Sequence, residues 1–195
     1  MQPNDTTPGG LRERLIDTGV TLVDAEGAAA LSLREIARRA GVSHGAPRRY
    51  FPTHLELLSA IARRGFTDLG EHATRALSDA GQDPRTQVAA LSRTYLDFAA
   101  RHRGMYELMF RHDLLESGEL GLRETSLPLF KVLTDLVASA RPDAEPALVA
   151  GALWANLHGV AQLWGWGSLR LAVAVEDIEP LLASVLDAHL GPAPR

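Results

Sequence analysis

The positively charged side chains of this sequence are concentrated in one short segment, residues 34–49. Its arginines are Arg34, Arg38, Arg39, Arg48 and Arg49, and its acid is Glu35, so five positive charges less one negative leave a local +4. Arginine binds nucleic-acid phosphates and also reads guanine edges. The segment therefore indicates a polyanionic partner. The alternative is that the segment is an ordinary solvated helix face. Arginine makes up 19 of the 20 Lys and Arg residues, so it is simply the usual cation of this chain.

The same segment has the pattern of two short helices joined by a tight turn. Ser32 has the side chain of an N-cap, and Glu35 follows at the three-residue spacing of a capping box. Gly41 can adopt the positive φ that ends this helix, and Ser43 is expected to cap a second helix that runs to about Tyr50. This arrangement predicts a helix-turn-helix motif, whose second helix enters the major groove of DNA.

The elements around this motif are expected to be helices throughout. Apolar residues recur at spacings of three and four, and no stretch alternates apolar and polar residues as a strand would. The pattern predicts an all-α fold of about nine helices. Besides the motif, the periodic segments are 11–23, 55–69, a segment after Asp83-Pro84, a segment from about Gly118 to Val137, 147–166 and 178–186.

Length and composition restrict the class of protein. The chain has 195 residues, and its 46% apolar and 23% charged residues are ordinary for a globular domain. It has no Cys, which excludes disulfides, thiolate metal sites and cysteine nucleophiles. There is no apolar run of about 18 residues and no secretory signal at the N-terminus, so we expect a cytoplasmic protein.

Three motifs of common enzyme classes are missing from the sequence. It has no Walker A loop, no Gly-x-Gly-x-x-Gly after a strand and no His-Glu-x-x-His. The seven histidines are scattered, and none shows the spacing of a metal site. We therefore expect no enzymatic activity, no metal and no cofactor.

A longer pattern runs through the motif: Ile36-Ala37-x-x-Ala40-Gly41-Val42-Ser43-x-Gly45, then Tyr50-Phe51 and Leu55 to Leu58. In residue type and spacing it resembles the TetR/AcrR family of one-component transcriptional regulators, over residues 11–70. The resemblance implies a three-helix DNA-binding head followed by a helical body that binds a ligand and forms a homodimer.

The resemblance also implies a division of the chain. We expect a disordered arm over 1–10, a DNA-binding domain over 11–53 with a connecting helix over 54–77, a ligand-binding and dimerisation domain over 78–191, and a tail over 192–195. The residues expected to contact DNA are Ser32, Arg34, Ser43, His44, Gly45, Ala46, Arg48, Arg49, Tyr50 and His54.

Three positions depart from the family pattern or from helix chemistry. Arg48 stands where the family usually has an aromatic residue, and His54 stands where it usually has Lys; both family residues commonly touch phosphates. Arg48 can contact a phosphate or a base instead, whereas His54 is a weaker cation whose charge depends on pH. Pro47 removes one backbone donor from the expected second helix.

The body has a concentration of aromatic residues between 154 and 166. Trp154, Leu157, His158 and Ala161 share one helical face, and Trp154-x-x-x-His158-Gly159 is similar to the Trp-His-Gly signature of one C-terminal domain type in this family. The candidate ligand pocket consists of Tyr95, Phe98, Met105, Met109, Phe110, Trp154 and His158. Core packing is the alternative for each of them. Apolar walls with few acids favour a neutral or amphipathic small molecule.

The resemblance further implies that the last two long helices of each subunit form a four-helix bundle across the dimer axis. The residues expected at this interface are Ala150, Leu153, Leu157, Ala161, Ile178, Leu182, Val185 and Leu186. The sequence thus predicts a ligand-responsive regulator that binds a palindromic operator as a dimer and is released by a small molecule. Repression is the commonest action in the family, so we expect a repressor. The alternative is a helical ligand-binding or scaffold protein that has lost DNA binding.

Overall fold

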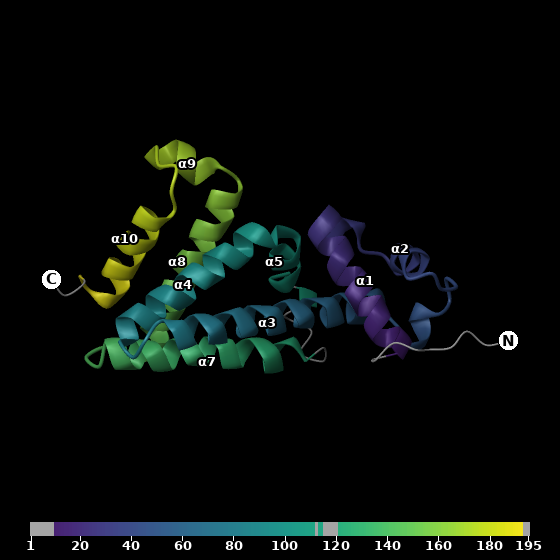
Figure 1. The fold of residues 1–195 in the computed structure, drawn as a ribbon, viewed down its shortest axis with the longest axis horizontal. Coiled ribbons are helices and arrows are strands. Elements are labelled where there is room, and N and C mark those ends of the chain that lie inside the picture. The colour runs from purple at the N-terminus through teal and green to yellow at the C-terminus, as the bar shows by residue number, and fades with distance from the viewer. Residues whose placement is uncertain (1–9, 112, 115–120, 193–195) are drawn as a thin grey trace. The chain divides into compact units, whose positions relative to one another are not determined.

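A computed structural model describes residues 10–111, 113–114 and 121–192 of the chain (Figure 1). All regular elements of these residues are helices, so the predicted all-α class is confirmed. They are nine α-helices and two short 3₁₀ helices: α1 (Gly10–Glu26), η1 (Ala28–Ala30), α2 (Leu33–Arg39), η2 (Pro47–Arg49), α3 (His54–Asp79), α4 (Pro84–Arg101), α5 (Arg103–Met109), α7 (Leu122–Ala140), α8 (Pro146–Gly165), α9 (Ser168–Val173) and α10 (Glu179–Leu190).

Several helix ends lie where the sequence signals place them. Ser32 Oγ accepts the backbone N–H of Glu35 at 3.1 Å, as an N-cap does. Gly41 has a φ of 69°, in the left-handed region that favours glycine. Asp83 accepts the N–H of Thr86 at 2.8 Å before Pro84 starts α4, and the hydrogen bonds from Thr86 lower the pKa of this carboxyl.

The second helix of the motif differs from the prediction. The sequence predicts a helix from Ser43 to about Tyr50, but the structure has only the 3₁₀ helix η2 from Pro47 to Arg49. Ser43 accepts the N–H of Ala46 through its backbone carbonyl, at 3.0 Å, and its side chain does not cap η2. Proline supplies no N–H, so the turn before it has one backbone bond fewer with which to continue as an α-helix.

Other boundaries shift in the body. The helix α9 was not predicted. The predicted helix start near residue 118 lies outside the described residues, where α7 begins at Leu122. The expected arm and tail also lie outside them, apart from Gly10 and Pro192.

None of the described helices has both the length and the apolarity needed to span a bilayer.

The chain forms two compact units. Unit 1 takes in residues 1–67 and 102–125, and unit 2 takes in residues 68–101 and 126–195, so α3 contributes to both. Unit 1 therefore includes α5 in addition to the predicted head. The sequence predicts single boundaries instead, near residues 53 and 78, and its assignment of a DNA-binding and a ligand-binding domain stays a prediction.

The core of unit 1 lies between α1, α2, the first part of α3 and α5. Leu22, Ile36, Ile61 and Met109 are fully buried in it. Helices α1 and α5 approach closely at Gly104, where a Cβ atom would lie 2.2 Å from the carbonyl oxygen of Val23. This packing supports α2 and the turn that follows it.

The core of unit 2 lies between α4, α7, α8 and α10, with α8 packed against both α4 and α10 (Figure 1). Val88, Leu153 and Leu182 are buried at its centre. Two arginines stabilise the C-terminal end of α10: Arg85 donates to the carbonyl of Gly191, and Arg141 donates to the carbonyl of His189 at 2.9 Å. Cations are favourable there because the last carbonyls of a helix lack backbone partners.

Candidate functional site

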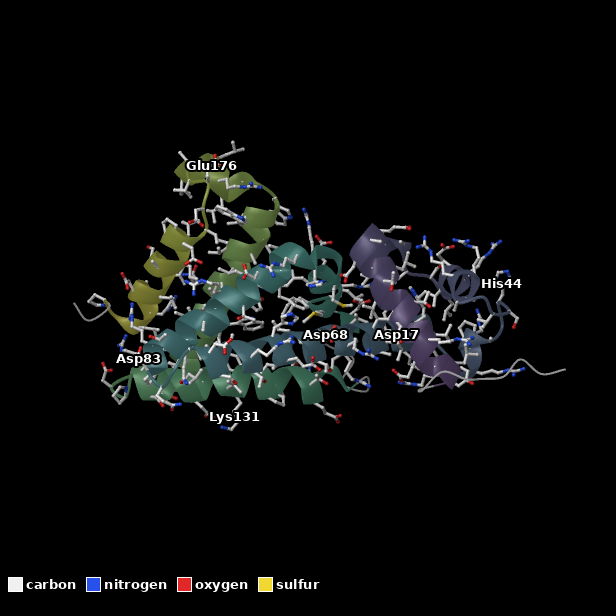
Figure 2. The ribbon with its side chains drawn as sticks, in the orientation of Figure 1. Asp17, His44, Asp68, Asp83, Lys131 and Glu176 are labelled. Carbon is white, nitrogen blue, oxygen red and sulfur yellow. The ribbon has the colours of Figure 1, made fainter. Side chains whose placement is uncertain are left out.

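The turn after α2 has the geometry of a helix-turn-helix joint. Ile36 and Ala37 on the inner face of α2 are fully buried. The N–H of Val42 donates to the carbonyl of Ala37 at 3.0 Å, so the chain folds back at once after Gly41. Ser43, His44 and Gly45 are exposed, and Figure 2 shows His44 on the connection between α2 and η2.

Gly41 to Gly45 also has the Gly-x-Ser-x-Gly spacing of a hydrolase nucleophile elbow. That motif requires a strand before the serine and a helix after it. Here a helix, α2, precedes the serine, and the described part of the chain contains no strand. The stretch is therefore a turn between helices.

All residues predicted to contact DNA lie at the surface of unit 1. Nine of the ten are exposed and Ala46 is partly exposed; the exposed ones are Ser32, Arg34, Ser43, His44, Gly45, Arg48, Arg49, Tyr50 and His54. The guanidinium groups of Arg34, Arg48 and Arg49 have no acidic partner among the residues that the structure describes. These three arginines can therefore bind an anion without first breaking an ion pair.

The η2 segment is anchored beneath this surface. Pro47 and Phe51 are buried, and the N–H of Phe51 donates to the carbonyl of Pro47 at 2.8 Å. The guanidinium of Arg12 lies over the ring of Phe51, 5.3 Å from its centroid. Because the buried residues Pro47 and Phe51 fix the backbone on either side, the side chains of Arg48 and Arg49 project to solvent.

Two of the five arginines in the basic segment are already paired, which the charge count did not reveal. Arg38 donates to both carboxylate oxygens of Glu35, at 2.9 and 2.6 Å, and Arg39 donates to Glu35 at 2.7 Å and to Glu26. The hydrogen bonds from Arg38 and Arg39 lower the pKa of Glu35 to about 2, so this carboxylate is ionised throughout the physiological range.

His54 has a structural contact as well as an exposed position. Its Nε2 lies 2.9 Å from the carbonyl oxygen of Leu31, to which it can only donate. Thr53 caps the same helix end, because its Oγ accepts the N–H of Glu56 at 3.2 Å. A phosphate contact by His54 stays a prediction, and it would have to use Nδ1.

The structure separates the predicted pocket residues into two groups. Tyr95, Phe98, Trp154 and His158 belong to unit 2, and Met105, Met109 and Phe110 belong to unit 1. Met105 and Met109 are buried against Gly65, where a Cβ atom would lie 2.7 Å from both sulfurs. Phe110 packs edge-on against Phe66, with ring centroids 5.7 Å apart. These contacts agree with core packing, and a ligand contact by the unit 1 residues stays a prediction.

The unit 2 group contains a polar pair among aromatic rings. The Tyr95 hydroxyl lies 2.8 Å from Nδ1 of His158, and the Trp154 ring lies edge-on to His158 and to Phe130, with centroids 6.2 and 6.1 Å away. Burial lowers the pKa of His158, which favours the neutral imidazole. A neutral imidazole can accept a hydrogen bond from the Tyr95 hydroxyl at Nδ1 and still donate one from Nε2. No group of three or more acidic and histidine side chains that could hold a metal occurs in the described ranges.

The residues predicted at the dimer interface pack against the core of their own chain. Six of the eight are buried in the core of their own chain: Ala150, Leu153, Leu157, Leu182, Val185 and Leu186. Ala161 and Ile178 are partly buried against the same core. A buried side chain offers little surface to a partner, so this burial favours core packing, and a contact of these residues with a second subunit stays a prediction.

The outward face of α8 carries a different apolar stripe. It repeats at spacings of three and four and consists of Leu148, Ala152, Ala155, Gly159, Leu163 and Trp166, hereafter the α8 stripe. Leu148 is 72% exposed and Trp166 is 61% exposed. No atom lies within 4 Å of a Cβ built on Gly159, so the middle of the stripe is open. Because α8 is apolar on both faces, its periodicity alone could not show which face points inward.

Comparisons with known proteins agree with this geometry. Residues 15–61 match the family described as bacterial regulatory proteins, tetR family, and residues 88–189 match the tetracyclin repressor-like, C-terminal domain. The chain is 38% identical over 80 residues to the HTH-type transcriptional regulator BetI of Stenotrophomonas maltophilia (strain R551-3), and this match spans 41% of each protein.

Two solved structures are similar over nearly the whole chain. One is a protein of unknown function from Rhodococcus sp. RHA1, 27% identical, with a TM-score of 0.75 and 97% of both chains covered. The other is the multidrug binding protein EbrR complexed with imidazole, 26% identical, with a TM-score of 0.61 and 96% of this chain and 98% of that chain covered.

Proposed function

The chain belongs to the TetR family of bacterial regulatory proteins, and we propose from this that it is a one-component regulator that binds operator DNA through unit 1 and a small molecule through unit 2. The observation that carries the proposal is the pair Arg48 and Arg49. Both are exposed, both follow the Gly41 turn, and neither has an acidic partner among the described residues. An accessible guanidinium group can contact either a phosphate or a base edge.

We propose that the regulator acts as a homodimer on an operator with two-fold symmetry. A single reading segment touches few base pairs, and two heads about 34 Å apart can enter successive major grooves on one side of the duplex. The α8 stripe supports a dimer, because monomeric proteins seldom leave a contiguous apolar face exposed. Its small residues, Ala152, Ala155 and Gly159, permit close approach by a helix of the second subunit.

The proposed effector is a neutral or amphipathic small molecule that contacts the Tyr95–His158 pair. Aromatic rings with one polar pair are typical of sites that bind apolar ligands and orient them by a hydrogen bond. The similar protein EbrR is a multidrug binding protein whose structure holds imidazole, which supports a small-molecule effector here. Binding would release the operator only to the extent that the effector prefers the DNA-free state.

The test is a titration of DNA from upstream of the protein's own gene with the wild type and with Arg48→Ala and Arg49→Ala. Loss of a phosphate contact should reduce the salt dependence, the slope of log K against log salt, by about one unit. Loss of a base contact should cost about 1–3 kcal/mol on the operator alone. Arg101→Ala is the matched control, because Arg101 is an exposed arginine of α4 in unit 2. If the wild type does not bind this DNA, or if both variants bind like it, the proposal is wrong.

A further inference from the structure

We infer that Glu35 restrains sequence-independent DNA binding, by holding the guanidinium groups of Arg38 and Arg39 in an ion-pair network that keeps them from phosphates. The inference rests on the proposed function, since it assigns a role to an acid within the proposed DNA-binding segment. In this role Glu35 raises the specificity of DNA binding, although its own negative charge repels DNA.

The network occupies most of the polar capacity of the Glu35 carboxylate. Arg38 binds it with both Nε and one terminal nitrogen, the two-bond geometry in which arginine holds a carboxylate most firmly. Arg39 binds the same carboxylate through Nε and reaches Glu26 with a terminal nitrogen. Glu26 ends α1 and Arg39 ends α2, so the network also connects two helices of unit 1.

The charge available for DNA is consequently smaller than the sequence suggests. Of the five arginines between residues 34 and 49, Arg38 and Arg39 are paired, while Arg34, Arg48 and Arg49 have no acidic partner in the described part of the chain. Non-specific affinity grows with each phosphate that a cation neutralises, whatever the sequence of the DNA. Because a regulator must find one operator among many competing sites, holding two cations back raises the ratio of specific to non-specific binding.

Stability accounts for only part of this network. The Arg38 side chain is 63% exposed, so water and salt screen its ion pair, whereas Arg39 and Glu35 are 32% and 29% exposed and also connect α2 to α1 through Glu26. The N-terminus of α2 is capped by Ser32, whose Oγ binds the backbone N–H of Glu35 and needs no carboxylate. The remaining alternative is that Glu35 orients the two arginines toward DNA. The two roles predict opposite effects of removing the charge.

The experiment compares Glu35→Gln with Glu56→Gln. Glu56 is a matched control, because it occupies the same position after the N-cap of α3 and belongs to the same unit, but its carboxylate binds Thr53 instead of an arginine. Each protein is titrated, as the full chain, against a fluorescein-labelled mixed-sequence duplex and against the upstream DNA at several salt concentrations. Thermal unfolding of each variant confirms that it is folded.

Because Arg39 keeps its pair with Glu26, Glu35→Gln releases Arg38, and it should bind the mixed-sequence duplex about eightfold more tightly at 0.1 M salt, with a slope steeper by about 0.9 for the new phosphate contact. Glu56→Gln should change both quantities much less. Adding Arg38→Gln and Arg39→Gln to Glu35→Gln should remove the gain.

Equal behaviour of Glu35→Gln and Glu56→Gln would overturn the inference, and weaker binding by Glu35→Gln would show that Glu35 orients the arginines. Both outcomes are compatible with binding of the upstream DNA by the wild type, so neither contradicts the proposed function. If the wild type binds neither duplex even at low salt, it is the proposed function that fails.

Discussion

Two buried serines of this protein differ in their hydrogen bonding. Ser59 on α3 and Ser92 on α4 are each 1% exposed. The hydroxyl of Ser92 donates to the carbonyl of Val88 at 2.8 Å, whereas the Ser59 hydroxyl has no partner among the described residues. A buried polar group without a hydrogen bond costs roughly 1–3 kcal/mol, while a satisfied one contributes roughly 0.5–1.5 kcal/mol.

The pair gives a prediction with its own control. Ser59→Ala should raise the free energy of unfolding by about 1 kcal/mol, because it removes an unsatisfied hydroxyl. Ser92→Ala, which makes the same chemical change at an equally buried site, should lower it by about 1 kcal/mol. Urea denaturation of both variants measures the difference. A loss of stability in Ser59→Ala equal to that in Ser92→Ala would mean that the Ser59 hydroxyl is hydrogen-bonded in solution.

Residue types were easier to predict than their partners. The sequence shows that Arg34, Arg48 and Arg49 carry charge near a turn, and all three are exposed as the motif requires. It does not show that Arg39 reaches Glu26, because that pair joins residues 13 apart and depends on how α1 lies beside α2. The i, i+3 spacing of Glu35 and Arg38 and the i, i+4 spacing of Glu35 and Arg39 are the parts of the network that helix geometry could have suggested.

At the scale of elements, the contact between α1 and α5 depends on one glycine. Gly104 lies in the first turn of α5, and a Cβ there would lie 2.2 Å from the Val23 carbonyl oxygen and 3.1 Å from the Gly27 Cα. Both are backbone atoms, which cannot move aside without shifting α1. Gly104→Ala should therefore lower the free energy of unfolding by about 1–3 kcal/mol or more.

Gly151→Ala is the control for this prediction. Gly151 lies inside α8, and no atom lies within 4 Å of the position of its added Cβ. Alanine should stabilise that helix by about 0.5–1 kcal/mol, because it loses less backbone entropy than glycine. Thermal unfolding of the two variants should therefore shift in opposite directions, and a stabilised Gly104→Ala would show that α5 is not seated on α1 in solution.

The elements themselves were predicted where local signals decide them. Ser32, Gly41 and Asp83-Pro84 all mark helix ends that the structure confirms. The helix predicted from Ser43 was wrong, because the missing N–H of Pro47 outweighs the cap signal of the serine. The helix α9 was missed, since its six residues are too few to show a period.

At the scale of the whole molecule, the faces of α8 decide how two copies could associate. The inward face, with Leu153 and Leu157, is covered by the protein's own helices. The outward face carries the α8 stripe, and its large members, Leu148, Leu163 and Trp166, are 72%, 40% and 61% exposed. Apolar area in water is costly at about 25 cal/mol per Å², so covering this stripe with a second copy is favourable. The sequence prediction placed the interface partly on α8 as well, but on residues of its inward face.

This argument predicts that Leu163→Glu converts the protein from a dimer to a monomer. A carboxylate in the middle of an apolar interface would have to lose its hydration without a partner, which costs far more than the interface gains there. In the monomer Leu163 is 40% exposed, so the glutamate should leave the fold intact. Leu127→Glu is the matched control, because Leu127 is a 60% exposed leucine of α7 away from the stripe.

Light scattering at micromolar concentration should report a dimer for the wild type and for Leu127→Glu, and a monomer for Leu163→Glu. The monomer should also bind the upstream DNA more weakly and with a salt slope reduced by about half, since one head then makes the phosphate contacts that two made together. A wild type that is monomeric, or a Leu163→Glu variant that remains a dimer, would mean that the α8 stripe is covered by something other than a second copy of this chain.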